Sequence, residues 1–178
     1  MKFRFSPRAT HQPLEDVADF ADITAVDAYL SGKRGSGIAP AWSDLNLIDL
    51  PAHLIPRVCV VDVHIDPLDF RYRFWGTKIT DMHRRDFTGE SVGTVPPKVY
   101  GDILMQQYAE VYRDAVPQAS LIAFIDEHHQ QSTYAVKRSP LSSDGQTVDM
   151  ILSIEQYDDD HRDLQELLAK VAEVYLEG

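Results

Sequence analysis

The sequence predicts an α+β fold: a five-stranded antiparallel sheet with helices on one face, plus N- and C-terminal helices. Short segments rich in β-branched and aromatic residues fall into two groups, residues 58–75 and 120–157. Apolar residues recur at helical spacing between these groups and on either side of them. The order is two strands, then helices, then three strands, so the first and last strands must pair in the middle of the sheet.

Length and composition indicate one globular domain. The chain has 178 residues, of which 44% are hydrophobic and 25% are charged. The net charge of −11 disfavours nucleic acid as a partner, because an acidic surface repels phosphate. No apolar run approaches the ~20 residues of a membrane helix, and no secretory signal is visible. We therefore expect a cytoplasmic protein that binds neither nucleic acid nor membranes.

Four segments follow one another along the chain. Residues 1–20 contain two prolines and no periodic pattern, which predicts a flexible lead. Residues 21–57 contain a helix that Asp22 can cap, followed by a loop. Residues 58–157 are the expected core, and residues 158–178 are an amphipathic helix.

The core begins with a predicted hairpin, formed by residues 58–65 and 70–75. Side chains alternate between the two faces of a strand. In the second strand this alternation gives two sets: Phe70, Tyr72 and Phe74 on one face, and Arg71, Arg73 and Trp75 on the other.

Two helices and three strands complete the core. The helices are expected at residues 77–85 and 99–115, and the strands at 120–126, 133–141 and 148–157. A last helix should begin near Asp160, which can form a capping box with Asp163. Its apolar stripe consists of Leu164, Leu168, Val171 and Tyr175.

Three segments resemble the Per-Arnt-Sim (PAS) family, and more narrowly its small bacterial single-domain members. They are FRYRFWGTKI (70–79), DFTGES (86–91) and SPLSSDGQTVDMIL (139–152), and the similarity covers about residues 23–157. The resemblance implies a stand-alone sensory or interaction module that binds a small molecule or a partner protein and catalyses nothing. It also implies a homodimer through the terminal helices.

The motif residues themselves suit a structural role. They are Arg73, Gly76, Thr77, Asp86, Thr88 and Gly89. A glycine at position 76 lets the chain leave a strand and enter a helix without a Cβ clash, and Thr77 can cap that helix. Asp86 and Thr88 can accept hydrogen bonds from backbone amides around a turn in which Gly89 takes a positive φ.

A sheet curled against short helices encloses a concave apolar space, the usual place for a small ligand. The side chains expected to face it are Tyr72, Phe74, Met82, Tyr108, Phe124, Tyr134, Val136 and Arg138. Tyrosine hydroxyls and the Arg138 guanidinium would orient a partly polar ligand, for example a carboxylate. The same aromatic residues would equally fill a dry core.

The residue pattern predicts no bound metal, haem or flavin. The single cysteine, Cys59, excludes a zinc site of several thiolates and lies outside the helices where flavin–thiol chemistry would need it. Residues 99–115 contain no histidine to ligate haem, and His83 lies in the preceding short helix. Adjacent acids and histidines, as in residues 126–129, rarely converge on one ion.

A Cys–His nucleophile is not expected either. Alternation places Cys59 on the face opposite Asp62 and His64. A small cone-shaped isomerase or hydratase nevertheless stays an alternative, with Asp62, Asp126 or Glu155 as its acid. A structural adaptor is a third. The last helix could bury its stripe on its own sheet, near Arg71 and Arg73, or against a second chain, which the resemblance favours.

Overall fold

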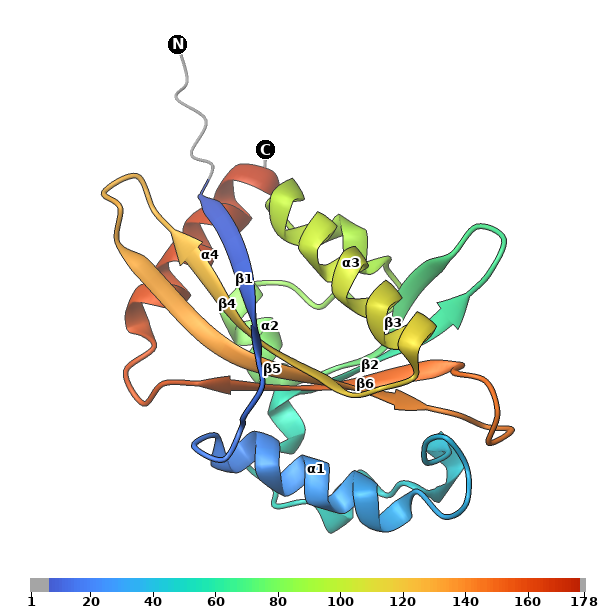
Figure 1. Ribbon diagram of the computed structural model, residues 1–178. Helices are drawn as coiled ribbons and strands as arrows, with labels where there is room; N and C mark the ends of the chain where they lie inside the picture. Colours follow the sequence, from blue (N-terminus) through green and yellow to red (C-terminus); the bar gives the residue numbers. More distant parts are fainter. Residues whose placement is uncertain (1–6, 177–178) are drawn as a thin grey trace.

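The computed structural model describes residues 7–176, whose strands form one antiparallel sheet in the order β1-β4-β5-β6-β2-β3 (Figure 1). The strands are β1 (Arg8–Leu14), β2 (Val58–His64), β3 (Asp69–Trp75), β4 (Gln118–Ile125), β5 (Gln131–Leu141) and β6 (Met150–Tyr157). The helices are α1 (Ala21–Lys33), α2 (Thr77–His83), α3 (Lys98–Asp114) and α4 (Arg162–Tyr175). Short 3₁₀ turns are η1 (Trp42–Asp44), η2 (Leu47–Asp49), η3 (Ile55–Arg57) and η4 (Val92–Thr94). Within residues 7–176 no helix is long and apolar enough to cross a membrane.

The central pair of strands confirms the predicted α+β class. β2 lies beside β6, from Val58 opposite Ile154 to Asp62 opposite Met150, so the first and last strands of the core meet in the middle of the sheet. Five strands follow the predicted order, and β1 adds a sixth.

β1 is the main departure from the sequence prediction. It pairs with β4 from Arg8 opposite Ile125 to Leu14 opposite Ala119. The prediction of a flexible lead is therefore wrong for residues 8–14, while residues 1–6 of that lead lie outside the described residues. The strand has little β-branched character of its own, and its conformation is stabilised by the backbone groups that β4 offers along its edge.

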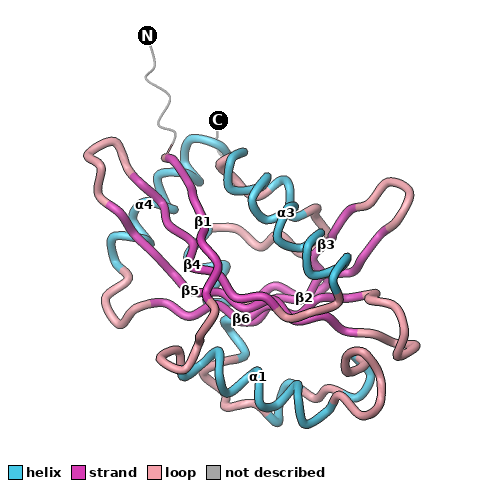
Figure 2. The backbone as a smooth tube through the Cα atoms, viewed as in Figure 1, coloured by secondary structure: helices cyan, strands magenta, loops and turns pink. Residues whose placement is uncertain are grey.

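Helices cover both faces of the sheet (Figure 2), and each face carries an apolar core. One face packs on α2, α3 and α4, and residues such as Cys59, Tyr134 and Ile151 point into that core. The opposite face packs on α1 and the loop that follows it, through residues such as Val60 and Ala135. Alternate residues of each strand thus serve different cores.

A β-bulge between β2 and β3 overturns part of the predicted alternation. Phe74 lies opposite Val60 and Tyr72 lies opposite Val61, so Arg73 is an extra residue. The extra residue reverses the face of the sheet to which the side chains after Arg73 point. Tyr72 stays in the core beneath the helices, but Phe74 packs in the core on the α1 side. Alternation placed Trp75 on the face opposite Tyr72, but it lies in the same core as Tyr72, with only 6% exposed.

The segment that follows covers the outer edge of β3. Asp86 Oδ1 accepts hydrogen bonds from the amide N–H of Thr88 at 2.8 Å and from its hydroxyl at 2.6 Å. Gly89 has a φ of +86° and donates its N–H to the Tyr72 carbonyl at 2.7 Å. The Tyr72 N–H in turn donates to the Glu90 carbonyl at 3.0 Å. The turn therefore satisfies backbone groups that an edge strand would leave open.

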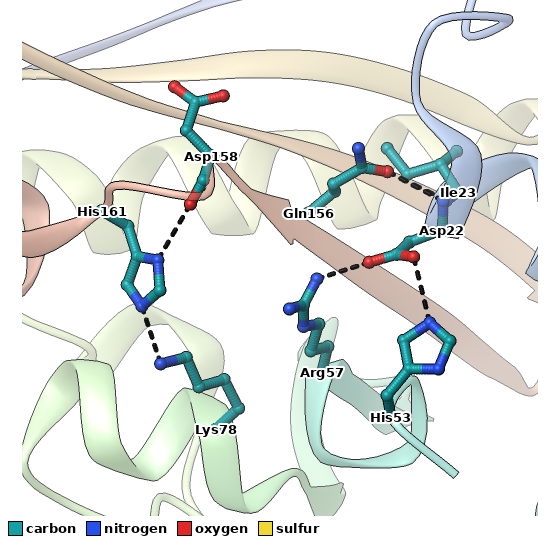
Figure 3. A network of polar contacts seen from close by, with 8 residues as sticks. All are labelled: Asp22, Ile23, His53, Arg57, Lys78, Gln156, Asp158 and His161. Carbon is teal, nitrogen blue, oxygen red and sulfur yellow. Dashed lines mark hydrogen bonds and ion pairs between the residues drawn. The ribbon is translucent and has the colours of Figure 1, made fainter. Parts of the chain in front are cut away.

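The predicted helix caps are not used. α1 begins after Phe20, and Gln156 Oε1 accepts the N–H groups of Asp22 (3.0 Å) and Ile23 (3.4 Å). The Asp22 carboxylate instead pairs with Arg57 and lies 3.4 Å from His53 Nε2 (Figure 3). Thr77 is likewise not a cap, since the N-cap of α2 is Gly76 and no side chain bonds there.

The start of α4 also differs from the predicted capping box. Its N-cap is His161, and the Asp160 side chain pairs with Arg162 at 2.8 Å instead. His161 Nδ1 donates to the Asp158 carbonyl at 2.9 Å, which leaves Nε2 to accept from Lys78 Nζ at 2.8 Å (Figure 3). This contact ties α4 to α2 at the end of β6.

α4 buries its apolar stripe within its own chain. Leu164, Leu168 and Val171 are each 2% exposed and belong to the core beneath α2 and α3. The preferred expectation, that this stripe pairs with a second chain, is corrected by that burial. The alternative expectation, that the stripe lies over its own sheet, is confirmed. The acids of α4 do not pair with Arg71 and Arg73, because those bases pair with Asp69 at 3.1 Å and Asp62 at 2.7 Å.

Candidate functional site

A row of four side chains crosses the sheet on the face covered by α2 and α3. Trp75 lies opposite Cys59, Cys59 opposite Ser153, and Ser153 opposite Arg138, on β3, β2, β6 and β5. All four are buried. An indole, a thiol, a hydroxyl and a guanidinium thus line one strip of an otherwise apolar core.

Two neighbouring residues of α3 hold the charged end of this row. Tyr108 Oη lies 3.2 Å from Arg138 Nη1, 3.0 Å from Ser153 Oγ and 3.6 Å from Cys59 Sγ. Gln107 Oε1 accepts from Arg138 Nε at 3.1 Å and from Nη2 at 2.9 Å. The Arg138 guanidinium also stacks 4.4 Å above the Tyr108 ring. Arg138 is therefore fixed in position by neutral groups.

The charge of Arg138 has no direct counterion among the described residues. The guanidinium is 2% exposed, and each of its hydrogen bonds goes to a neutral oxygen of Gln107, Tyr108 or Ser153. A buried charge is costly unless it is paired, and arginine stays protonated in proteins. This side chain is consequently the strongest potential anchor for an anion in the core.

Glu155 is the nearest buried acid by sequence position, on the same face of β6 two residues beyond Ser153. Burial raises the pKa of this carboxyl to about 7, partly offset by the hydroxyl of Tyr157 that donates to it and by the charge of Arg138. Near neutral pH the residue thus exists in both protonation states.

Aromatic residues fill the rest of this core. Tyr100 and Tyr134 share a hydrogen bond between their hydroxyls. His83 stacks on Tyr100 with ring centroids 5.9 Å apart, and burial lowers its pKa to about 4, so its imidazole is neutral. The indole N–H of Trp75 is the one buried side-chain polar atom of residues 7–176 without a hydrogen-bond partner.

Seven of the eight predicted ligand-contacting residues do share this core. They are Tyr72, Met82, Tyr108, Phe124, Tyr134, Val136 and Arg138, all buried. Phe74 does not join them because the bulge turns it toward α1. The sequence prediction did not include Gln107 and Ser153. Both are polar residues at positions where helical or strand periodicity predicts a buried apolar side chain, and this mismatch could have identified them.

The other chemical candidates take structural roles. Burial raises the pKa of the Cys59 thiol to about 11, so it stays protonated, and Asp62 pairs with Arg73. Asp126 Oδ1 accepts the N–H groups of His128 and Gln130, both at 2.8 Å, and so shapes its loop. No group of three or more His, Cys, Asp or Glu within residues 7–176 is placed to hold a metal ion.

Comparisons with known proteins give only remote likenesses. No protein-family model matches the chain, and no curated protein matches it either. Among solved structures, it is similar to an RNA-binding Light-Oxygen-Voltage receptor, with 8% identity and a TM-score of 0.45, over 93% of this chain. This chain spans only 43% of that receptor.

Two further structures are similar over most of their own length. The dark-state LOV domain of the photoreceptor Aureochrome1 has 9% identity and a TM-score of 0.47, over 75% of this chain and 95% of that one. A fungal LOV domain photoreceptor has 12% identity and a TM-score of 0.42, over 80% and 98%. At these scores the likenesses carry no conclusion about function, which has to be argued from the residues of this chain.

Proposed function

We propose that this chain is a PAS-type sensory module that binds a small carboxylate between the sheet and α3, with no catalytic output of its own. The observation that carries the proposal is the buried Arg138 guanidinium, which faces the helices and is held only by neutral groups. The motif resemblance to PAS proteins and the strand order β4-β5-β6-β2-β3 support the same assignment.

A ligand carboxylate would supply the counterion that Arg138 lacks. It would take over the two donors that now converge on Gln107 Oε1, and a bidentate pair of this kind contributes about 1.5–3 kcal/mol. The hydroxyl of Tyr108 already lies beside the guanidinium and would orient the bound group. Aromatic rings fill the core around Arg138 in this structure, so the apolar body of a ligand would have to displace some of them.

Matched ligand pairs test the proposal. Benzoate and phenylacetate should raise the melting temperature of the protein, and benzamide and phenylacetamide should not. Arg138→Lys should weaken carboxylate binding at least about tenfold, because an ammonium group cannot form the two parallel bonds. Arg73→Lys, in an exposed ion pair, is the matched control and should change nothing. Equal effects of acids and amides, or unchanged binding by Arg138→Lys, reject the proposal.

An enzymatic role remains the second candidate, and Glu155 is the residue that favours it. Among the three acids considered, only Glu155 is buried, and burial raises its pKa to about 7. The carboxylate of Glu155 accepts a hydrogen bond from the Tyr157 hydroxyl, however. Asp62 forms an ion pair with Arg73, and Asp126 accepts a backbone hydrogen bond that shapes its loop. We therefore place sensing first.

A further inference from the structure

One side-chain contact joins the edge strand β1 to the Arg138 site. His11 is half-buried on β1, and its Nδ1 lies 3.2 Å from Nε2 of the buried Gln107. Gln107 Oε1 is the acceptor for Arg138. A continuous chain of hydrogen bonds thus runs from the sheet edge through α3 to the guanidinium.

The donors and acceptors in this chain are fixed by chemistry. Arginine has only donors, so the amide oxygen of Gln107 must face Arg138 and the amide NH₂ must face His11. An NH₂ group can only donate, so His11 Nδ1 must accept and can carry no proton. A protonated His11 would place two donors face to face. Rotating the Gln107 amide would restore that bond only by turning its NH₂ onto Arg138.

We propose that His11 and Gln107 form a pH-dependent latch, in which neutral His11 fastens β1 to α3 and protonated His11 releases it. Histidine is the side chain that most readily changes its protonation state near neutral pH, which makes it suited to such a contact. A link between this latch and ligand binding rests on the proposed function. A carboxylate at Arg138 competes with Gln107 for the guanidinium donors that orient the Gln107 amide. Ligand binding at Arg138 and docking of β1 on α3 are then coupled.

Few charged groups face His11 from the elements around it. Ile122 of β4 lies opposite it in the sheet. Glu110 of α3 lines, together with His11, a surface groove of about 350 Å³ that also contains Gln118 and Ser120. Glu110 accepts a hydrogen bond from Gln106 at 3.0 Å. Glu110 is thus the acid that would receive a protonated His11, while Arg138 is the cation that would repel it.

The latch is testable without any ligand. ¹⁵N NMR of the histidine side chains should show His11 Nδ1 unprotonated at pH 7.5. Hydrogen–deuterium exchange of residues 8–14, corrected for intrinsic rates, should rise about two- to tenfold between pH 7.5 and 5.5, as expected for one lost hydrogen bond. His11→Asn keeps an acceptor near the Nδ1 position but cannot titrate, so its exchange should stay constant. His64→Asn, at the exposed end of β2, is the control.

Each part of the proposal has its own contrary result. A protonated Nδ1 at pH 7.5, or the same pH response in wild type and His11→Asn, overturns the latch. Gln107→Met should abolish the pH response, and a retained response would show that Gln107 does not transmit it. Benzoate should change exchange of residues 8–14 in wild type and not in Gln107→Met. If benzoate does not bind, the proposed function fails while the ligand-free result still decides the latch; if it binds without affecting β1, the linkage fails alone.

Discussion

Burial favours the neutral form of both Glu155 and His83, so it shifts the pKa values of these two side chains in opposite directions. Burial raises the pKa of Glu155 from its ordinary 4.5 to about 7 and lowers that of His83 from 6.5 to about 4. Between about pH 4.5 and 7 the unfolded chain has fewer protons at Glu155 than the folded chain. Between about pH 4 and 6.5 the unfolded chain has more protons at His83 than the folded chain.

These two groups should flatten the pH dependence of stability. Glu155 favours folding at low pH and loses that contribution as the pH rises through 7, whereas His83 loses its contribution as the pH falls through 4. Glu155→Gln should therefore expose a loss of stability on acidification from pH 6.5 to 4, on the order of 3 kcal/mol. His83→Phe should expose the opposite slope between pH 5 and 7. Urea unfolding across this range measures both, and a wild-type slope unchanged in either variant would contradict the assignment.

At the residue scale, the sequence predicted Arg138 and most of its aromatic neighbours, because strand alternation places them on one face. Gln107 escaped prediction because helix periodicity marks it only as an inward position. Its role depends on which strand lies beneath α3, and that is a long-range fact. His11 escaped for the stronger reason that its strand was not expected.

At the scale of elements, the junction between β3 and α2 is set by steric contact. A Cβ on Gly76 would lie 2.2 Å from the Pro56 carbonyl oxygen and 2.7 Å from that of Val58. The φ of Gly76 is −66°, which any residue adopts, so the need for glycine comes from packing against backbone. The sequence motif thus indicated the correct residue, and the structure supplies the atoms that would clash.

Gly76→Ala should therefore destabilise the fold by at least about 3 kcal/mol, because backbone atoms of η3 and β2 cannot move aside cheaply. Gly32→Ala, within α1 where an added Cβ meets no atom within 4 Å, is the matched control and should stabilise by up to about 1 kcal/mol. Chemical denaturation of both variants gives the comparison. Similar unfolding midpoints for the two would refute the steric account.

The bulge at Arg73 shows where pattern-based prediction of an element ends. A strict period of two describes β3 correctly from Phe70 to Tyr72 and incorrectly at Phe74 and Trp75. One inserted residue reverses the faces, and no local residue preference signals it. The candidate site gained Trp75 and lost Phe74 for this reason.

At the scale of the whole molecule, the pairing of the first and last core strands was predictable, because two strands precede the helices and three follow them. The partner of α4 was not. An amphipathic stripe specifies burial but not the surface that buries it. In this chain the stripe packs on its own core, together with α2 and the sheet.

Leu168→Asp should consequently unfold or strongly destabilise the chain, by at least about 3 kcal/mol, since it puts a charge into an apolar core. Val99→Asp, in the first turn of α3 where the side chain is exposed, should cost little. Thermal unfolding and light scattering at micromolar concentration report both fold and mass. A dimeric wild type that Leu168→Asp converts into a stable, folded monomer would contradict this account.

The two edges of the sheet differ in what covers their outward-facing backbone groups. At β3, the turn around Gly89 occupies part of the outer backbone. At the other edge, β1 pairs with β4 and so covers the backbone of a strand that carries the apolar Leu121, Ile122 and Phe124. A molecule whose β1 has detached would present a bare strand, a template for exchanging β1 between copies or for aggregation. By pairing with β4, β1 thus keeps the backbone groups of β4 from pairing with another chain.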